Sequence, residues 1–279
     1  MSGSPPIRIR IDTWFVLLIG SVAGLMMFLW PLVTTPPQGT AHNADSPFIF
    51  VLILPLVIAV VLADISRGRI DVKAIAILGL LAGIGAVLRP IGAGTAGLET
   101  VFFLLILGGR VFGPGFGFVL GSTTLFASAL LTAGVGPWLP FQMLAASWVG
   151  LGAGLLPRCR GRVEIALLSI YGVIAAYAYG FLMNMWFWPY AIGTFAGDGG
   201  DAGLQFVPGD AVASNLHRFF LFTLATSTLG WDTGRAITNV VAIVVVGSAV
   251  LATLRRTRRR AAFDATVEFE GPVAPRPGG

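Results

Sequence analysis

Long apolar runs separated by short polar breaks make up most of this chain. Eight runs stand out, at about residues 14–33, 47–64, 74–89, 98–112, 114–133, 138–156, 164–190 and 233–254. A polar segment near 191–211 and an amphipathic stretch near 212–230 precede the last run. About 20 residues cross a hydrocarbon core upright, so the longer runs can span a bilayer as α-helices. The runs at 74–89 and 98–112 are short enough to be two parts of one broken element.

The composition agrees with this pattern. Of the 279 residues, 56% are hydrophobic and only 11% are charged, whereas soluble domains carry about 25% charged residues. The alternation typical of a membrane barrel is missing, and helices are the other structure that satisfies backbone groups inside lipid. The sequence therefore predicts an all-α fold, a polytopic bundle of membrane helices embedded in the lipid bilayer.

Charge predicts the orientation of the bundle. If both termini are cytoplasmic, only three of the 18 basic residues lie outside, namely Arg89, Arg218 and Arg235. The outer loops carry Asp45, Asp198, Asp201 and Asp210. The excess of arginine on one side follows the positive-inside rule and explains the basic C-terminal stretch without a nucleic-acid partner. The first run is longer than the core of a signal peptide, so we expect a retained helix. The Arg-rich, Lys-poor usage suits a GC-rich bacterial genome and hence a bacterial plasma membrane.

Motifs for catalysis are missing. A phosphate-binding loop needs Gly-Lys followed by Ser or Thr, and the single lysine, Lys73, precedes Ala74. No Gly-x-Ser-x-Gly motif occurs, and Cys159, His42 and His217 do not have the spacing of a metal site. We therefore predict neither an enzyme, nor a cofactor, nor a metal site.

Two acidic residues lie near predicted outer helix ends. Glu99 opens the run 98–112, where a carboxylate favours the positive end of the helix dipole. Asp232 is expected to cap the last helix, with Arg235 one turn later. Ion-driven transporters usually carry ionisable groups deeper in their spans.

Polar and aromatic residues gather at the outer ends of several runs. Asn and Gln inside a span are costly unless they find partners, and four such places on one side predict an outward-facing ligand cavity with aromatic walls. An interfacial aromatic belt and interhelical hydrogen bonds are the plainer interpretations. Gln142 follows the proline-broken turn GVGPWLPF, and we expect it to be a polar anchor with Trp138 as a wall. The candidate ligand-binding residues are Arg89, Glu99, Trp138, Gln142, Asn184, Trp188, Trp231 and Asn239.

Small residues recur at helical spacing in LGLLAGIGAVLRP, residues 78–90. Gly79 and Gly83 form one such pair, and Ala82 and Ala86 form another. Faces of this kind let a second helix approach closely, either within the bundle or from another protein. Similar spacing at Gly150 and Gly154 makes the pattern weak by itself.

Three longer stretches resemble one known family. GRVFGPGFGFVLG (109–121), SALLTAGVGPWLPFQMLAASWVGLGAG (128–154) and TSTLGWDTGRAITNVV (226–241) are similar to the substrate-specific S component of energy-coupling factor (ECF) vitamin importers. The resemblance covers about residues 74–260. It implies a six-helix bundle that binds a vitamin near its outer surface and does not hydrolyse ATP. It also implies docking on a transmembrane scaffold subunit with two cytosolic ATPase subunits, with Ala82 and Ala86 matching the family's scaffold contact.

The resemblance divides the chain into three regions. Residues 1–73 hold an extra N-terminal pair of spans, 74–260 the six-helix substrate-binding core, and 261–279 a disordered cytoplasmic tail. The extra pair can pack on the core, cover the docking face or contact another subunit. A cobalamin-, thiamine- or riboflavin-like ligand fits an aromatic cavity equally well. Two other functions stay open, a self-sufficient secondary transporter or channel and a membrane-assembly protein without a ligand.

Overall fold

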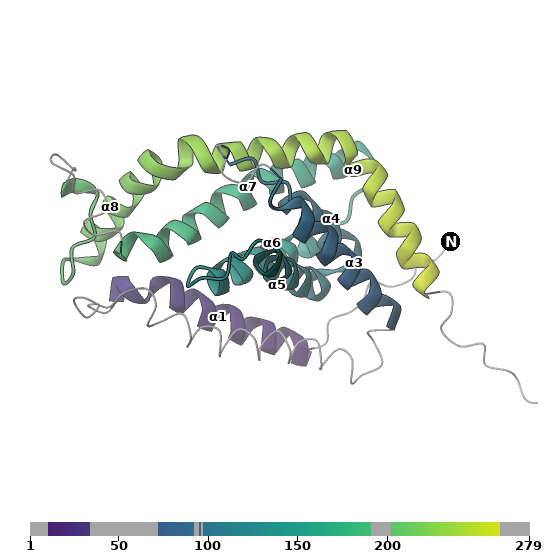
Figure 1. The fold of residues 1–279 in the computed structure, drawn as a ribbon, viewed down its shortest axis with the longest axis horizontal. Coiled ribbons are helices and arrows are strands. Elements are labelled where there is room, and N and C mark those ends of the chain that lie inside the picture. Colours follow the sequence, from purple (N-terminus) through teal and green to yellow (C-terminus); the bar gives the residue numbers. More distant parts are fainter. Residues whose placement is uncertain (1–10, 34–71, 92–94, 96, 191–201, 263–279) are drawn as a thin grey trace, which may run out of the picture.

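The computed structural model describes residues 11–33, 72–91, 95, 97–190 and 202–262 (Figure 1). All regular secondary structure within these residues is helical, which confirms the predicted all-α bundle. The predicted run 47–64 and nearly all of the predicted tail lie outside the described residues. The helices are α1 (Ile11–Val33), α3 (Val72–Leu88), α4 (Phe102–Phe112), α5 (Pro114–Leu131), α6 (Leu139–Leu155), α7 (Arg162–Phe187), α8 (Val212–Thr223), the π-helical η3 (Leu224–Asp232) and α9 (Thr233–Ala262), with short 3-10 turns η1 (Trp188–Tyr190) and η2 (Ala202–Leu204).

Most of the predicted runs correspond to one helix each. The runs at 74–89 and 98–112 are separate helices, α3 and α4, which removes the alternative of one broken element. The last run is the exception, because no turn separates it from the amphipathic stretch that precedes it. Instead α8, η3 and α9 follow one another without a break, and residues Val212–Arg259 form one continuous helical stretch of 48 residues, which bends within α9 (Figure 1).

The outer surface of the bundle is apolar. Among the described residues, three helices are long and apolar enough to cross a membrane, Pro114–Leu131, Arg162–Phe187 and Val212–Arg259. Large side chains such as Leu80, Leu130 and Val245 are more than half exposed. Water would oppose such exposure and lipid would not, so the described part of the chain has the surface of a membrane protein.

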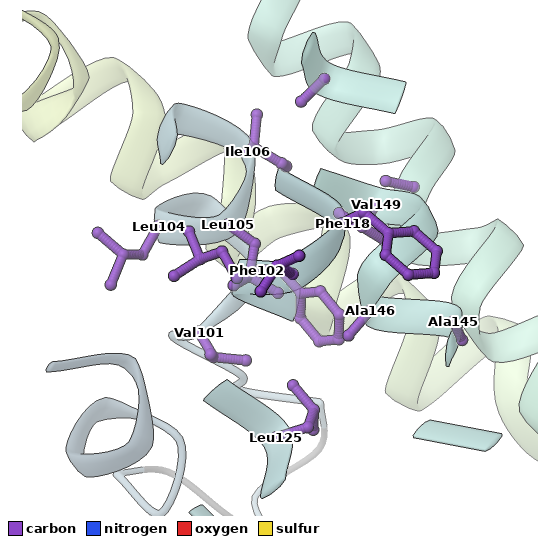
Figure 2. Packing of buried hydrophobic residues seen from close by; sticks show 14 of the residues in the cluster. Val101, Phe102, Leu104, Leu105, Ile106, Phe118, Leu125, Ala145, Ala146 and Val149 are labelled. Atoms are coloured by element: carbon purple, nitrogen blue, oxygen red, sulfur yellow. The ribbon is translucent and has the colours of Figure 1, made fainter. Parts of the chain in front are cut away.

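The core lies between α4, α5 and α6, where buried side chains from all three helices interdigitate (Figure 2). The helices meet almost backbone to backbone at Gly109, Gly117 and Gly150. A Cβ atom on Gly150 would lie 2.1 Å from the Gly117 carbonyl oxygen. The spacing of Gly150 and Gly154 therefore serves packing inside the bundle, and Gly154 lies against Pro114 in the same way.

Helix α1 packs on the core, on the side of the bundle opposite α9 (Figure 1). Trp148 Nε1 donates a 2.9 Å hydrogen bond to Ser21 Oγ, and the Phe28 ring lies 5.0 Å from that of Phe141. Phe28 is fully buried in this contact. The first helix of the extra N-terminal pair therefore packs on the core, which is one of the three positions expected for that pair.

A charged cluster fixes one end of the bundle, which we call the basic end. Arg110 Nε lies 2.7 Å and Arg255 Nη2 2.6 Å from the same oxygen, Glu164 Oε1, and the Glu164 side chain is only 2% exposed. Arg110 Nη1 also donates to the Leu156 carbonyl. These bonds join α4, α7 and α9. The opposite end holds Arg89, Glu99 and Trp138 and is called the distal end below.

Helix α8 closes the distal end over a small second core. Trp188 is buried among Met185, Phe206, Phe219 and Phe222, and its Nε1 donates to the Leu204 carbonyl at 2.7 Å. The segment before α8 is fixed by hydrogen bonds between the Asn215 side chain and the backbone of Val207.

At the surface of the same segment, Arg218 Nη1 lies 2.7 Å from Asp210 Oδ2. This hydrogen bond holds the pKa of the Asp210 carboxyl below its usual value.

Candidate functional site: a polar cavity between α7, η3 and α9

A cavity of about 280 Å³ lies at the distal end, between the last turns of α7, the end of α8, η3 and the start of α9. Its walls combine aromatic rings with a few polar side chains, as small-molecule sites commonly do. The lining residues are Gly180, Met183, Asn184, Phe187, Phe222, Thr226, Ser227, Trp231, Asp232 and Arg235.

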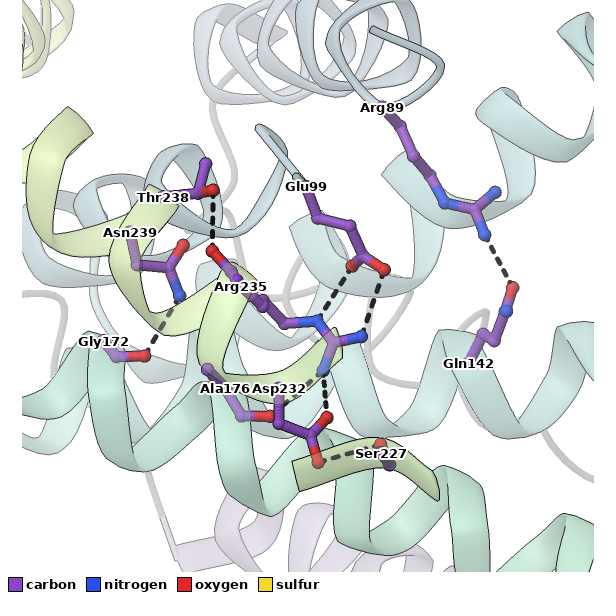
Figure 3. A network of polar contacts seen from close by, with 11 residues as sticks. Arg89, Glu99, Gln142, Gly172, Ala176, Ser227, Asp232, Arg235, Thr238 and Asn239 are labelled. Carbon is purple, nitrogen blue, oxygen red and sulfur yellow. Dashed lines mark hydrogen bonds and ion pairs between the residues drawn. The ribbon is translucent and has the colours of Figure 1, made fainter. Parts of the chain in front are cut away.

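Arg235 is the centre of a charged network behind this cavity (Figure 3). Its Nε and Nη2 donate to the two carboxylate oxygens of Glu99, at 3.0 and 3.1 Å. Its Nη1 donates to Asp232 Oδ1 at 2.8 Å and to the Ala176 carbonyl at 3.2 Å. The Arg235 side chain is 7% exposed, so the positive charge depends on these partners.

Aromatic rings also hold the guanidinium in place. Arg235 Cζ lies 4.9 Å from the ring centre of Tyr179 and 5.5 Å from that of Phe102. These distances permit cation–π attraction, which is strongest where water is excluded. Arg235 is therefore fixed by α7, by α4 and by the segment before α4, and it acts as a rigid part of the cavity wall.

Asp232 and Ser227 form the polar floor beside Arg235. Ser227 Oγ donates to Asp232 Oδ2 at 2.9 Å, and the Asp232 side chain is only 2% exposed. Helix α7 passes close by because residue 180 is glycine, and a Cβ atom there would overlap the Asp232 carboxylate. A larger residue at position 180 would push α7 and η3 apart and change the shape of the cavity.

Asn184 supplies an unused donor at the cavity. Its Nδ2 is buried and has no hydrogen-bond partner among the described residues. A buried amide without a partner costs about 1–3 kcal/mol, so such a group in a cavity wall favours a ligand that accepts its hydrogen bond.

The π-helical turns of η3 shape the remaining wall. A π-helix holds more residues per turn than an α-helix, and such turns occur frequently at functional sites. Here they carry Trp231 and Asp232 next to each other on the cavity side. Gly97, with φ of +80°, lets the segment before α4 rest on the backbone of Trp231, where a Cβ atom would overlap the carbonyl oxygen.

The structure separates the eight candidate ligand residues into groups. Asn184 and Trp231 line the cavity, and Glu99 lies behind it in the Arg235 network. Arg89 Nη2 donates to Gln142 Oε1 at 2.9 Å, outside the lining (Figure 3). Trp138 is also outside the lining and is 41% exposed.

The other two candidates are buried in helix contacts. Trp188 belongs to the second core under α8, and Asn239 Nδ2 donates to the Gly172 carbonyl at 3.0 Å between α9 and α7. Each of these side chains thus has an interhelical or core contact in place of a position in the cavity wall.

Two local interpretations of acidic residues were wrong. Asp232 does not cap a helix, because η3 continues directly into α9 and the carboxylate instead binds Ser227 and Arg235. Glu99 does not lie in the first turn of a helix, because α4 starts at Phe102 after an N-cap at Val101. A neighbouring cation outcompetes the weak field of a helix end for each carboxylate.

The list of candidate ligand residues omits Ser227, Asp232 and Arg235, although Asp232 and Arg235 belong to the polar groups at the outer helix ends from which the cavity was predicted. The sequence does contain a signal for Asp232 and Arg235, because their Asp-x-x-Arg spacing puts two opposite charges on one helix face beside an apolar run. Ser227 had no comparable signal, since only the widened turns of η3 bring it next to Asp232.

The small residues of α3 also divide into two faces. Gly79 and Gly83 are exposed, and a Cβ atom on either would meet nothing within 4 Å. Ala86 is fully buried and Ala82 is 6% exposed, because this side of α3 packs on α5. The pair Ala82 and Ala86, predicted to contact the scaffold, therefore faces its own bundle, which leaves only the glycines open to another protein.

Comparison with known proteins gives the family. A sequence model described as "ECF transporter, substrate-specific component" matches residues 73–229, more than half of the chain. The chain belongs to this family. The matched residues of this S component include α3 to α8 and the cavity wall from Gly180 to Ser227, while Trp231, Asp232 and Arg235 lie just beyond the match. No curated protein and no solved structure was found to match the chain.

Proposed function

We propose that this S component captures a vitamin or related small molecule on the outer face of a bacterial plasma membrane. The bound molecule is delivered inward after the chain docks on a scaffold subunit that carries two ATPase subunits. The chain itself carries out no catalysis and needs no cofactor. The observation that supports this most strongly is the cavity at the distal end, which lies mostly within the residues matched by the family and opposite the basic end.

The size of the cavity restricts the ligand. Ligand pockets for drug-sized molecules range from about 300 to 1,000 Å³, and this cavity of about 280 Å³ lies at the lower limit. A corrinoid such as cobalamin is far too large for this space, whereas a ligand of one ring or a few small rings fits. The aromatic side chains of Phe187, Phe222 and Trp231 offer faces for such a ring.

The polar groups of the cavity orient the ligand. Asn184 Nδ2 is a free donor among the described residues, and Ser227 and Asp232 offer oxygens in the same lining. We assign ligand contact to Asn184 and Trp231 from the sequence-based set, and add Ser227 and Asp232. The pair Arg89 and Gln142 holds the end of α3 against the start of α6, and Glu99 positions Arg235.

The docking face follows from the exposed side of α3. Gly79 and Gly83 present backbone without side chains, so another helix can approach closely there. Helix α1 lies elsewhere on the bundle, against α6, α7 and α8, and leaves this face of α3 open.

Purification tests the proposal. The full chain, isolated from native membranes in lipid nanodiscs, is expected to carry a vitamin-sized molecule detectable by mass spectrometry after denaturation. Adding that molecule back to stripped protein should raise the melting temperature, since a ligand at 100 times its Kd stabilises by about 2.7 kcal/mol. A chain that releases no small molecule and whose melting temperature no vitamin raises would be the membrane-assembly protein considered above.

A self-sufficient transporter is distinguished by its energy requirement. Cells that express this chain alone should accumulate no ligand, and cells that also express the scaffold and ATPase subunits should. Uptake by the isolated chain in proteoliposomes, driven by an ion gradient, would refute the proposed dependence on ATPase partners.

A further inference from the structure

The charged side chains among the described residues that line the cavity are Asp232 and Arg235, one of each sign. The guanidinium of Arg235 is shared between Asp232 and Glu99, which lies behind the wall. The hydrogen bonds to Glu99, Asp232 and the Ala176 carbonyl use four of the five N–H donors of that guanidinium. Arg235 therefore has little left to offer an incoming carboxylate or phosphate.

The other basic side chains of the described distal end do not supply a cation to the cavity either. Arg89 binds Gln142 and does not line the cavity (Figure 3). Arg218 binds Asp210 at the surface before α8. On the predicted outer side as a whole, six carboxylates stand against the guanidinium groups of Arg89, Arg218 and Arg235; the acidic residues are Asp45, Glu99, Asp198, Asp201, Asp210 and Asp232. A field of this sign attracts cations to a binding site and repels anions.

The hydrogen-bonding groups point to the same kind of ligand. The free donor of Asn184 needs an acceptor such as a ring nitrogen or a carbonyl oxygen. Asp232 and Ser227 present oxygens that can accept from a ring N–H or an amino group. A nitrogen heterocycle that carries both an acceptor and a donor satisfies both kinds of group, and its faces can stack on Trp231.

We infer that the ligand is a compact nitrogen heterocycle that is neutral or singly cationic and carries no carboxylate or phosphate group. This inference rests on the proposed function and specifies the chemical class of the molecule captured. A carboxylate placed in the cavity would lie beside Asp232 without a free cation among the described residues that line it, and burial of such an unpaired charge is strongly unfavourable.

Matched pairs of vitamins that differ in charge test the inference. The full chain in nanodiscs is titrated by calorimetry with nicotinamide and nicotinate, with biotin amide and biotin, and with thiamine and thiamine monophosphate. In any pair that binds, the neutral or cationic member is expected to bind at least tenfold more tightly than the anionic one. Equal or tighter binding of the anionic member overturns the inference, and so does a failure of all six compounds to bind.

Two variants locate the source of the discrimination. Replacing Asp232 with Asn removes the nearest negative charge. The ratio of the two Kd values within a vitamin pair should then fall at least threefold. If Asp232→Asn does not fold, Glu99→Gln removes the more exposed carboxylate of the same network and serves the same purpose. A ratio that neither substitution changes would refute the role of this network in ligand choice.

The proposed function has its own readout. Cells that express the complete importer are tested for uptake of radiolabelled biotin and nicotinate as well as thiamine and nicotinamide. Uptake of an anionic vitamin that depends on this chain would overturn the inferred ligand class and leave the proposed function intact. If uptake of none of the four vitamins depends on this chain, the proposed function itself is rejected, whatever the calorimetry shows.

Discussion

Arg235 and Glu99 are joined by two hydrogen bonds, of 3.0 and 3.1 Å, although 136 residues separate them along the chain. Glu99 lies between α3 and α4, and Arg235 lies near the start of α9. The pair thus ties the first connection of the core to its last helix. Asp232 completes the network from the turn that precedes Arg235, and both acidic groups depend on the same guanidinium.

Removing Arg235 should strongly destabilise the fold. Arg235→Met leaves the Asp232 carboxylate, which is 2% exposed, without a counter-ion, and breaking a buried ion pair in this way costs about 3–5 kcal/mol. Urea or thermal unfolding in detergent measures the loss. Arg218→Met is the matched control, because its pair with Asp210 is at the surface, where water screens an ion pair and its loss changes stability little. Equal losses in the two variants would contradict the buried network.

The same substitution at two asparagines should separate the cavity from the helix contacts. Asn184→Leu removes the free donor in the cavity wall and should weaken ligand binding at least tenfold. Asn239→Leu removes one hydrogen bond between α9 and α7, worth about 0.6 kcal/mol on average in membrane bundles, and should change the Kd less than twofold. Calorimetry with the co-purifying molecule gives both values. A larger effect at Asn239 would restore it to the ligand site.

Two glycines should respond oppositely to an added methyl group. Gly150→Ala places a Cβ atom against the backbone of Gly117, and overpacking of this kind costs about 1–3 kcal/mol. Gly79→Ala meets nothing within 4 Å and should be neutral or stabilising by up to about 1 kcal/mol, since alanine favours helix. Thermal unfolding of the isolated chain compares the two. Tolerance at Gly150 would mean that α5 and α6 are less closely packed than described.

Larger residues on the open face of α3 should block assembly without affecting ligand binding. Gly79→Leu combined with Gly83→Leu fills the exposed glycine face, so less scaffold subunit should co-purify with the chain when the importer is co-expressed. Val245→Phe on the exposed face of α9 adds an apolar group away from α3 and serves as the control. If the glycine variant still assembles fully, the scaffold contacts a different face.

The sequence was sufficient to predict the class of fold and most of the helices, because long apolar runs leave few alternatives in lipid. It also placed Asn184 and Trp231 among the candidates that line the cavity. It did not decide between ligand contact and helix contact for Trp188 and Asn239, since a tryptophan or asparagine near a helix end has the same pattern in either role. Nor did spacing reveal which face of α3 is open, because Gly79, Ala82, Gly83 and Ala86 lie on adjoining sides of one short helix.

The unbroken helix from Val212 to Arg259 has a mechanical consequence. Its 48 residues have a length of roughly 70 Å along the bent helix axis, at about 1.5 Å per residue, which is more than twice the roughly 30 Å thickness of a hydrocarbon core. At least one end must therefore project beyond the lipid or lie in its headgroup layer. The helix carries Trp231 and Asp232 in its first half and Arg255 and Arg258 near its end, where Arg258 Nη1 donates to the Val111 carbonyl. No loop interrupts the helix between the cavity residues and these arginines, so a tilt of its first half on ligand binding would be transmitted to the basic end through continuous helix.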